Sequence, residues 1–74
     1  VQADERLKER ARQIHALGIE AIDALHLAAA EQSADFFLTV DDRVLRKALK
    51  FPDHLGVRVM SPIDFVLLKE FTDA

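Results

Sequence analysis

The chain has 74 residues, of which 13 are acidic, 10 are basic and none is cysteine, and its net charge is −3. A chain of this length forms at most one domain, and it buries only about 60% of the surface that it exposes when unfolded. The lack of cysteine excludes disulfides and thiol chemistry, and a slightly acidic chain is not typical of a non-specific nucleic-acid binder.

Two helices are expected first. Apolar residues recur every three or four positions over residues 3–17, which is typical of a helix with one buried stripe, and Gly18 is suited to end it. The second helix is expected over residues 23–32. It is rich in Ala and Leu almost all round, which predicts a helix buried on every side.

The rest of the chain alternates strands with helices. Residues 36–40 form a short apolar run, which is typical of a strand covered on both faces in a parallel sheet. Asp41 and Asp42 then open a helix, a loop follows at 51–56, and residues 57–60 form a second strand. The last helix begins with Ser61 as N-cap and Pro62 in its first turn. A strand followed by a helix and a second strand predicts that the two strands pair in parallel, which is typical of an α/β fold.

Two short parallel strands with flanking helices cannot bury both faces of a sheet or pair both of its edges. The chain also begins at Val1 rather than at a methionine. We therefore expect residues 1–74 to be the C-terminal part of a single domain. The further strands would come from an absent N-terminal half or from another copy, so we expect an oligomer or a complex.

Two acids are expected to meet at one edge of this sheet. Asp23 starts the second helix and Asp41 follows the strand 36–40. The chain runs out along the helix and back along the strand over similar lengths, roughly 15 and 17 Å. Both acids should therefore lie at the carboxyl end of the strand, where open α/β sheets form their sites. Carboxylates there suit Mg²⁺ or Mn²⁺, which activates water for attack on a phosphate.

Other interpretations of these residues stay open. Asp23, and either Asp41 or Asp42, are each suited instead to cap a helix. His26 lies one turn beyond Asp23, and it either orients a carboxylate or forms a structural hydrogen bond. Thr39 either holds a site acid or is present because β-branched residues are common in strands. Four cations on the third helix either meet phosphates or form a solvated face: Arg43, Arg46, Lys47 and Lys50.

Two segments together resemble the C-terminal half of a PIN domain. The first is Gly-Ile-Glu-Ala-Ile-Asp-Ala-Leu-His-Leu-Ala-Ala-Ala at 18–30, and the second is Ala-Asp-Phe-Phe-Leu-Thr-Val-Asp-Asp-Arg-Val-Leu-Arg-Lys-Ala at 34–48. Residues 57–65 fit the closing strand and helix, so the resemblance spans about residues 3–68 and half of the family's domain. It implies a Rossmann-like α/β/α fold and a ribonuclease that depends on Mg²⁺ or Mn²⁺. Many members are VapC-type toxins of bacterial toxin–antitoxin pairs, and many form dimers.

The resemblance also assigns roles to residues. Asp23 matches the family's acid at the start of the buried helix, and Asp41 matches the acid after the strand. Thr39 stands two residues earlier in its usual place, and Asp42 is an adjacent match to the metal ligands. The family's first aspartate and its central glutamate have no counterpart in this sequence.

The sequence therefore predicts the C-terminal part of a PIN-type endoribonuclease toxin that is inactive alone. RNA is the expected substrate and an antitoxin protein an expected partner. The alternatives are a non-catalytic PIN-like module that dimerises or binds a protein, and a phospho-acceptor domain with Asp41 as acceptor. Residues 24–30, the longest apolar stretch, are too few to span a bilayer, and no secretory signal is visible, so a cytoplasmic location is expected.

Overall fold

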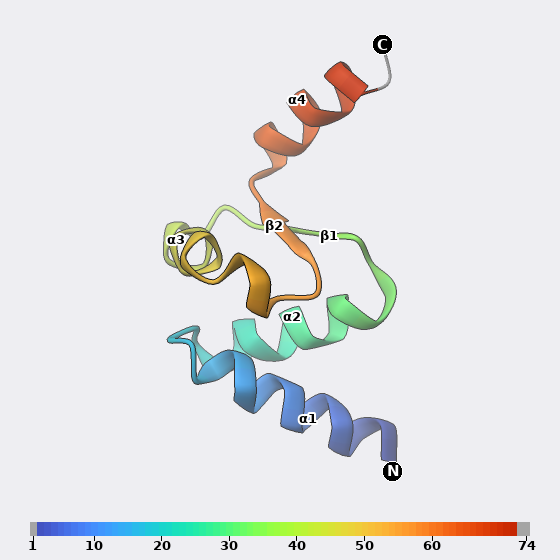
Figure 1. Cartoon of the computed structure of the whole chain (residues 1–74), viewed down its shortest axis with the longest axis vertical. Helices are drawn as coiled ribbons and strands as arrows, with labels where there is room; N and C mark the ends of the chain where they lie inside the picture. The colour runs from blue at the N-terminus through green and yellow to red at the C-terminus, as the bar shows by residue number, and fades with distance from the viewer. Residues whose placement is uncertain (1, 73–74) are drawn as a thin grey trace.

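The structure is a computed structural model that describes residues 2–72, with side chains described from residue 5 to residue 71. Within these residues, four α-helices, a 3₁₀ turn and two strands follow one another (Figure 1). Their bounds are α1 Gln2–His15, α2 Ala21–Ser33, β1 Phe36–Leu38, α3 Asp42–Lys50, η1 Pro52–His54, β2 Arg58–Met60 and α4 Pro62–Thr72. The α/β class and the predicted order of elements are confirmed, with boundaries that differ by a few residues. No helix in this part of the chain is both long and apolar enough to cross a membrane.

α1 and α2 pack against each other as a helical hairpin (Figure 1). The turn between them needs Gly18, whose φ of +101° lies in the left-handed region that favours glycine. The predicted role of Gly18 in ending this segment is confirmed, although α1 itself ends at His15, two residues earlier than predicted. Ile14 and Leu27 are fully buried where the helices meet, and Ala24 and Ala28 allow a close approach. The hairpin therefore supplies a large part of the hydrophobic core.

α2 is buried on one side only. Ala24, Leu27 and Ala28 face the core, whereas 70% of Ile22 and 41% of Leu25 are exposed. The prediction of a helix buried on every side is therefore wrong. α1 and β1 contact the inner face of α2, and within residues 2–72 nothing comparable covers its outer face.

The two strands are parallel and joined through α3, as predicted. Phe37 pairs with Val59 in the register, and both pack against the core cluster formed by α1, α2 and α3. The strand was predicted to be covered on both faces, and this is wrong because Leu38 and Val40 remain 43% and 81% exposed. Only one face of this short sheet is filled by the described core.

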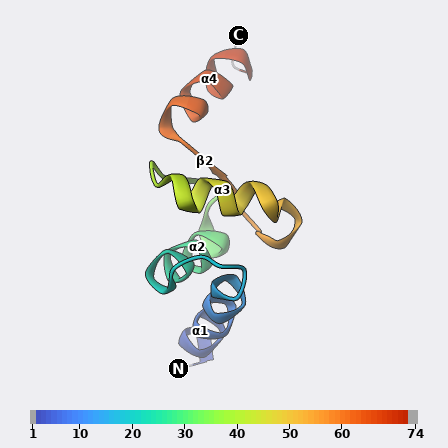
Figure 2. The same cartoon turned by 90° about the vertical axis from the view of Figure 1, so that its left-hand side faces the viewer.

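α4 extends away from the rest of the molecule, as both views show (Figures 1 and 2). Ser61 Oγ accepts a hydrogen bond from the Asp64 N–H at 3.1 Å, which confirms the predicted N-cap. Near its start, the Phe65 ring meets the Phe36 ring edge-on at 5.2 Å. The projection of α4 accounts for a radius of gyration of 12.9 Å, against about 11 Å for a compact chain of this length.

An ion pair links the helical hairpin to the segment before β2. Arg10 donates from Nε and Nη2 to the two carboxylate oxygens of Glu31, at 2.7 and 2.8 Å. Glu31 also accepts the Gly56 N–H at 2.7 Å, and Arg10 donates to the His54 carbonyl. The two-fold contact with Arg10 lowers the pKa of Glu31, although partial burial opposes the change.

Replacing Glu31 by Gln is expected to reduce the free energy of unfolding by about 2 kcal/mol at neutral pH, since a charge-assisted pair is lost. The folded-state pKa of Glu31 lies below its ordinary value of 4.5. Its contribution is therefore present above about pH 4.5 and is lost as the pH falls through the folded pKa. In urea unfolding, the difference in stability between the native chain and Glu31→Gln should be largest at pH 7 and should shrink as the pH is lowered below 4.5.

Glu9→Gln is the matched control for this change. Glu9 pairs with Arg12 at 3.2 Å, but its side chain is 61% exposed, so its loss should cost at most about 1 kcal/mol. Equal losses of stability from the two variants at pH 7 would contradict the role of Glu31.

Candidate functional site

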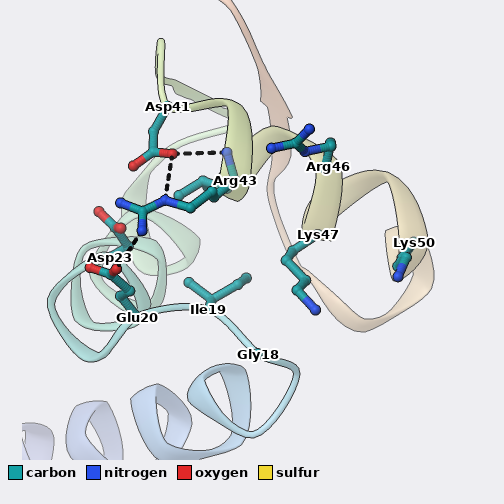
Figure 3. Close-up of a pocket in the computed structure, with 10 residues that line it drawn as sticks. Gly18, Ile19, Glu20, Asp23, Asp41, Arg43, Arg46, Lys47 and Lys50 are labelled. Carbon is teal, nitrogen blue, oxygen red and sulfur yellow. Dashed lines mark hydrogen bonds and ion pairs between the residues drawn. The ribbon is translucent and has the colours of Figure 1, made fainter.

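A pocket of about 370 Å³ opens between the start of α2, the loop before it and one side of α3 (Figure 3). Ile19 and Val44 form its apolar floor, and both are buried in the core. Its walls carry opposite charges, with carboxylates from α2 and from the end of β1 and with cations from α3. The pocket is therefore open to solvent, charged and set on a packed base.

Asp23 and Asp41 both line this pocket, although they come from separate segments. Asp23 lies in the first turn of α2, and Asp41 follows β1 and directly precedes α3. The packing of α2 beside β1 places both residues at the carboxyl end of the strand, the edge that the sequence predicts for them. Figure 3 shows the two side chains on the same side of the pocket.

The capping interpretation holds for one of these acids and fails for the other. Asp41 is the N-cap of α3, and its Oδ1 accepts the Arg43 N–H at 2.9 Å. Asp23 is not an N-cap, because α2 begins two residues before it and Glu20 occupies the cap position. Asp23 therefore has no capping role that would explain its place in the pocket.

Arg43 lies among the carboxylates of the pocket (Figure 3). Its Nη1 is 3.1 Å from Glu20 Oε1, and its Nε is 3.7 Å from Asp41 Oδ1. The Arg43 and Glu20 side chains are 71% and 65% exposed, so these ion pairs are weak and are readily exchanged for other partners. Glu20 was not predicted as a site residue from the sequence, since it lies in the wrong segment to replace the family's central glutamate.

The opposite end of the pocket is basic. Arg46, Lys47 and Lys50 all line it from α3. Lys47 is half-buried, and it lies so close to the turn at Gly18 that a Cβ there would be 2.8 Å from its Nζ. Lys47 is thus less exposed than a fully solvated face would have it, whereas Arg43, Arg46 and Lys50 are exposed as well as lining the pocket.

Three other predicted site residues lie outside the pocket lining. Thr39 supports Asp41, because its Oγ1 accepts the Asp41 N–H at 3.1 Å. Asp42 is exposed as the first residue of α3, and His26 is exposed on α2. Neither Asp42 nor His26 is brought to the two acids by this structure.

The chemistry of the pocket partly suits a hard divalent cation. Carboxylate oxygens such as those of Asp23 and Asp41 are the ligands that Mg²⁺ and Mn²⁺ prefer. Among the residues that the structure describes, however, no group of three or more acids or histidines is placed to hold a metal ion. This part of the chain therefore offers less than a complete ligand set.

The family to which the chain belongs is not shown by comparison with known proteins. No family model, no curated protein and no solved structure matches this chain. Its function must therefore be inferred from the geometry and charge of the pocket.

Proposed function

We propose that this chain is part of a PIN-type, metal-dependent endoribonuclease, a toxin of a toxin–antitoxin pair, and that it contributes two of the metal ligands. The observation that carries the proposal is the meeting of Asp23 and Asp41 in one pocket at the carboxyl end of a parallel strand. Because Asp23 does not cap its helix, helix formation alone does not explain that meeting. Cations beside the acids favour an anionic substrate such as RNA.

In this proposal, each side chain of the pocket has a separate role. Asp23 and Asp41 hold Mg²⁺ or Mn²⁺, which supplies a polarised phosphoryl oxygen and a water of lowered pKa when bound. Thr39 fixes the backbone of Asp41 through its hydroxyl. Arg43, weakly paired and exposed, neutralises the acids before a cation binds and can then turn toward the RNA.

The remaining ligands are proposed to come from further strands of the same sheet. Within residues 2–72 the sheet has only β1 and β2, so each strand has an edge free to pair. A strand added to the free edge of β1 and parallel to it would end near the pocket, because Asp41 of the pocket follows β1. In the complete protein these strands belong to an N-terminal half or to another copy of the chain.

RNA cleavage by the assembled protein, meaning this chain together with its further strands, tests the proposal. We expect cleavage with Mg²⁺ or Mn²⁺, none with EDTA, and negligible cleavage by the 74-residue chain alone. If the chain alone cleaves RNA with Mn²⁺ and Asp41→Asn abolishes this, then copies of the chain complete the site. Cleavage that is insensitive to EDTA, or no cleavage by the assembled protein, would contradict the proposal.

A second candidate function is a non-catalytic module that associates with itself or with a partner protein. The observation in its favour is the exposed apolar surface of α4, where Ile63 and Phe71 are 73% and 83% exposed. Such a surface is typical of an interface rather than of an isolated helix. The two candidates differ in the cleavage assay, because only the first requires activity that depends on Asp23 and Asp41.

A further inference from the structure

We propose that three cations of α3, called here the cation row, hold the backbone of single-stranded RNA beside the phosphodiester that is cleaved. The cation row consists of Arg46, Lys47 and Lys50. This inference rests on the proposed function, because it places the cleaved phosphodiester at the acidic end of the same pocket. It adds the residues that position the substrate and the part of the RNA that they recognise.

All three members of the cation row line the pocket from α3, and Figure 3 shows Lys47 and Lys50 farther from the acids than Arg43 is. Lys50 follows Lys47 by three positions and Arg46 by four. Residues three or four apart in a helix are neighbours on its surface, so Lys50 neighbours both of the other cations. From residue 46 to residue 50 the helix rises roughly 6 Å, a distance on the scale of neighbouring phosphates in one strand. An RNA strand with one phosphodiester at Asp23 and Asp41 would thus pass along the cation row.

The charges of the cation row are not compensated within the described side chains. Arg10, Arg12 and Arg43 each have a carboxylate within ion-pair distance. Over residues 5–71, no such carboxylate is found for any member of the cation row. The row is therefore free to bind an external anion without breaking an ion pair.

Lys47 provides the observation that separates a binding site from a solvated surface. It is half-buried, and its ammonium group lies beside the turn at Gly18, where it lines the pocket. Among the described side chains, no carboxylate lies within ion-pair distance of this ammonium group. A phosphate in the pocket would supply the missing counter-charge.

The character of the pocket favours recognition of the RNA backbone rather than of its bases. Lysine acts as a flexible point charge, which suits phosphates. No aromatic side chain lines the pocket in the described part of the chain, so base stacking is not available there. We therefore expect binding that tolerates changes of sequence and weakens steeply with salt.

Fluorescence anisotropy of a short fluorescein-labelled oligouridylate, measured with the 74-residue chain in EDTA, tests this inference without cleavage. Lys47→Gln with Lys50→Gln should weaken binding about tenfold at low salt. The slope of log affinity against log salt should become shallower by about 1.4, since two phosphate contacts are lost. Lys47→Arg with Lys50→Arg keeps both charges and should retain binding within about twofold.

Arg6→Gln with Lys8→Gln is the charge-matched control, because it removes two exposed cations from α1, outside the pocket. Binding that is weakened equally by this control, or no binding by the native chain, would overturn the inference. So would competition by polyglutamate as strong as that by unlabelled oligouridylate, which would indicate an acidic protein partner. Circular dichroism should show the same helical content for every variant. If binding depends on the two lysines but the assembled protein cleaves no RNA, the proposed nuclease function fails and the RNA-binding role stands.

Discussion

Replacing Asp23 by Asn is expected to lower RNA cleavage by the assembled protein by about a hundredfold or more while changing its stability little. Asn keeps the size of the side chain but removes the charge that a divalent cation requires. Even residues that only support metal ligands cost about 10–100-fold when they are changed, so a direct ligand should cost at least as much. Cleavage is measured with Mn²⁺, and divalent-ion binding is measured as the shift in melting temperature that Mn²⁺ produces.

Stability should change by no more than about 1 kcal/mol in the absence of metal. Asp23 lies in the first turn of α2, where a negative charge contributes about 0.3–1 kcal/mol through the helix dipole. Removing that charge also relieves repulsion from the other pocket carboxylates, Glu20 and Asp41. The two effects oppose each other, so thermal melts without Mn²⁺ should nearly coincide.

Asp42→Asn is the matched control for Asp23→Asn. Asp42 is also an aspartate in the first turn of a helix, but it is exposed and lies outside the pocket lining. It should therefore retain cleavage and the Mn²⁺-induced shift. If Asp23→Asn retains both as well, Asp23 is not a metal ligand. If Asp23→Asn instead unfolds the protein, a structural hydrogen bond must replace the ligand role.

Replacing both Ile63 and Phe71 by Glu is expected to convert the 74-residue chain from an associated form into a monomer. Ile63, Leu67 and Phe71 recur every four residues along one side of α4, and all three are exposed. Burying apolar surface in an interface stabilises the associated form by about 25 cal/mol for each Å² removed from water. Two charged side chains on that surface would prevent its burial. Sedimentation velocity or light scattering gives the mass of each variant.

Leu49→Glu serves as the control for the α4 variant. Leu49 is 80% exposed, so it matches Ile63 and Phe71 in exposure, but it lies on α3. We expect this variant to remain associated. A stable native monomer, or dissociation by Leu49→Glu alone, would show that α4 does not form the interface.

Features that follow from neighbouring residues were predicted well. Ser61 and Asp64 form a local hydrogen bond, and the chain reversal at Gly18 depends on the conformation of a single residue. The order of strands and helices follows from the local pattern of apolar residues, and it predicts the parallel pair. These features need no knowledge of distant parts of the chain.

Burial and side-chain pairing depend on distant segments, and here the sequence was less informative. The composition of α2 does not show that Ile22 and Leu25 lack covering neighbours. The second helix was predicted to begin at Asp23, a residue suited to the N-cap position, yet the helix begins earlier, with Glu20 in the cap position.

In the candidate site, too, some features could be predicted from the sequence and others depend on how distant segments pack. The common position of Asp23 and Asp41 could be predicted, because the lengths of one helix and one strand fix where the chain returns. The contact of Arg43 with Glu20 could not, because it depends on the side-chain conformations of two residues from different helices. The position of Lys47 against the turn at Gly18 likewise depends on how α3 packs.

The α1–α2 hairpin also has a consequence for the order in which the chain folds. Its two helices are joined by a short turn, and the Arg10–Glu31 pair spans only 21 positions in the sequence, so little entropy is lost in bringing them together. The contact of Arg10 with the His54 carbonyl spans 44 positions, and the parallel strands cannot pair until α3 has crossed between them. Local contacts generally form faster than distant ones. The hairpin should therefore form first, and Glu31 then presents the acceptor that receives Gly56 when β2 reaches the sheet.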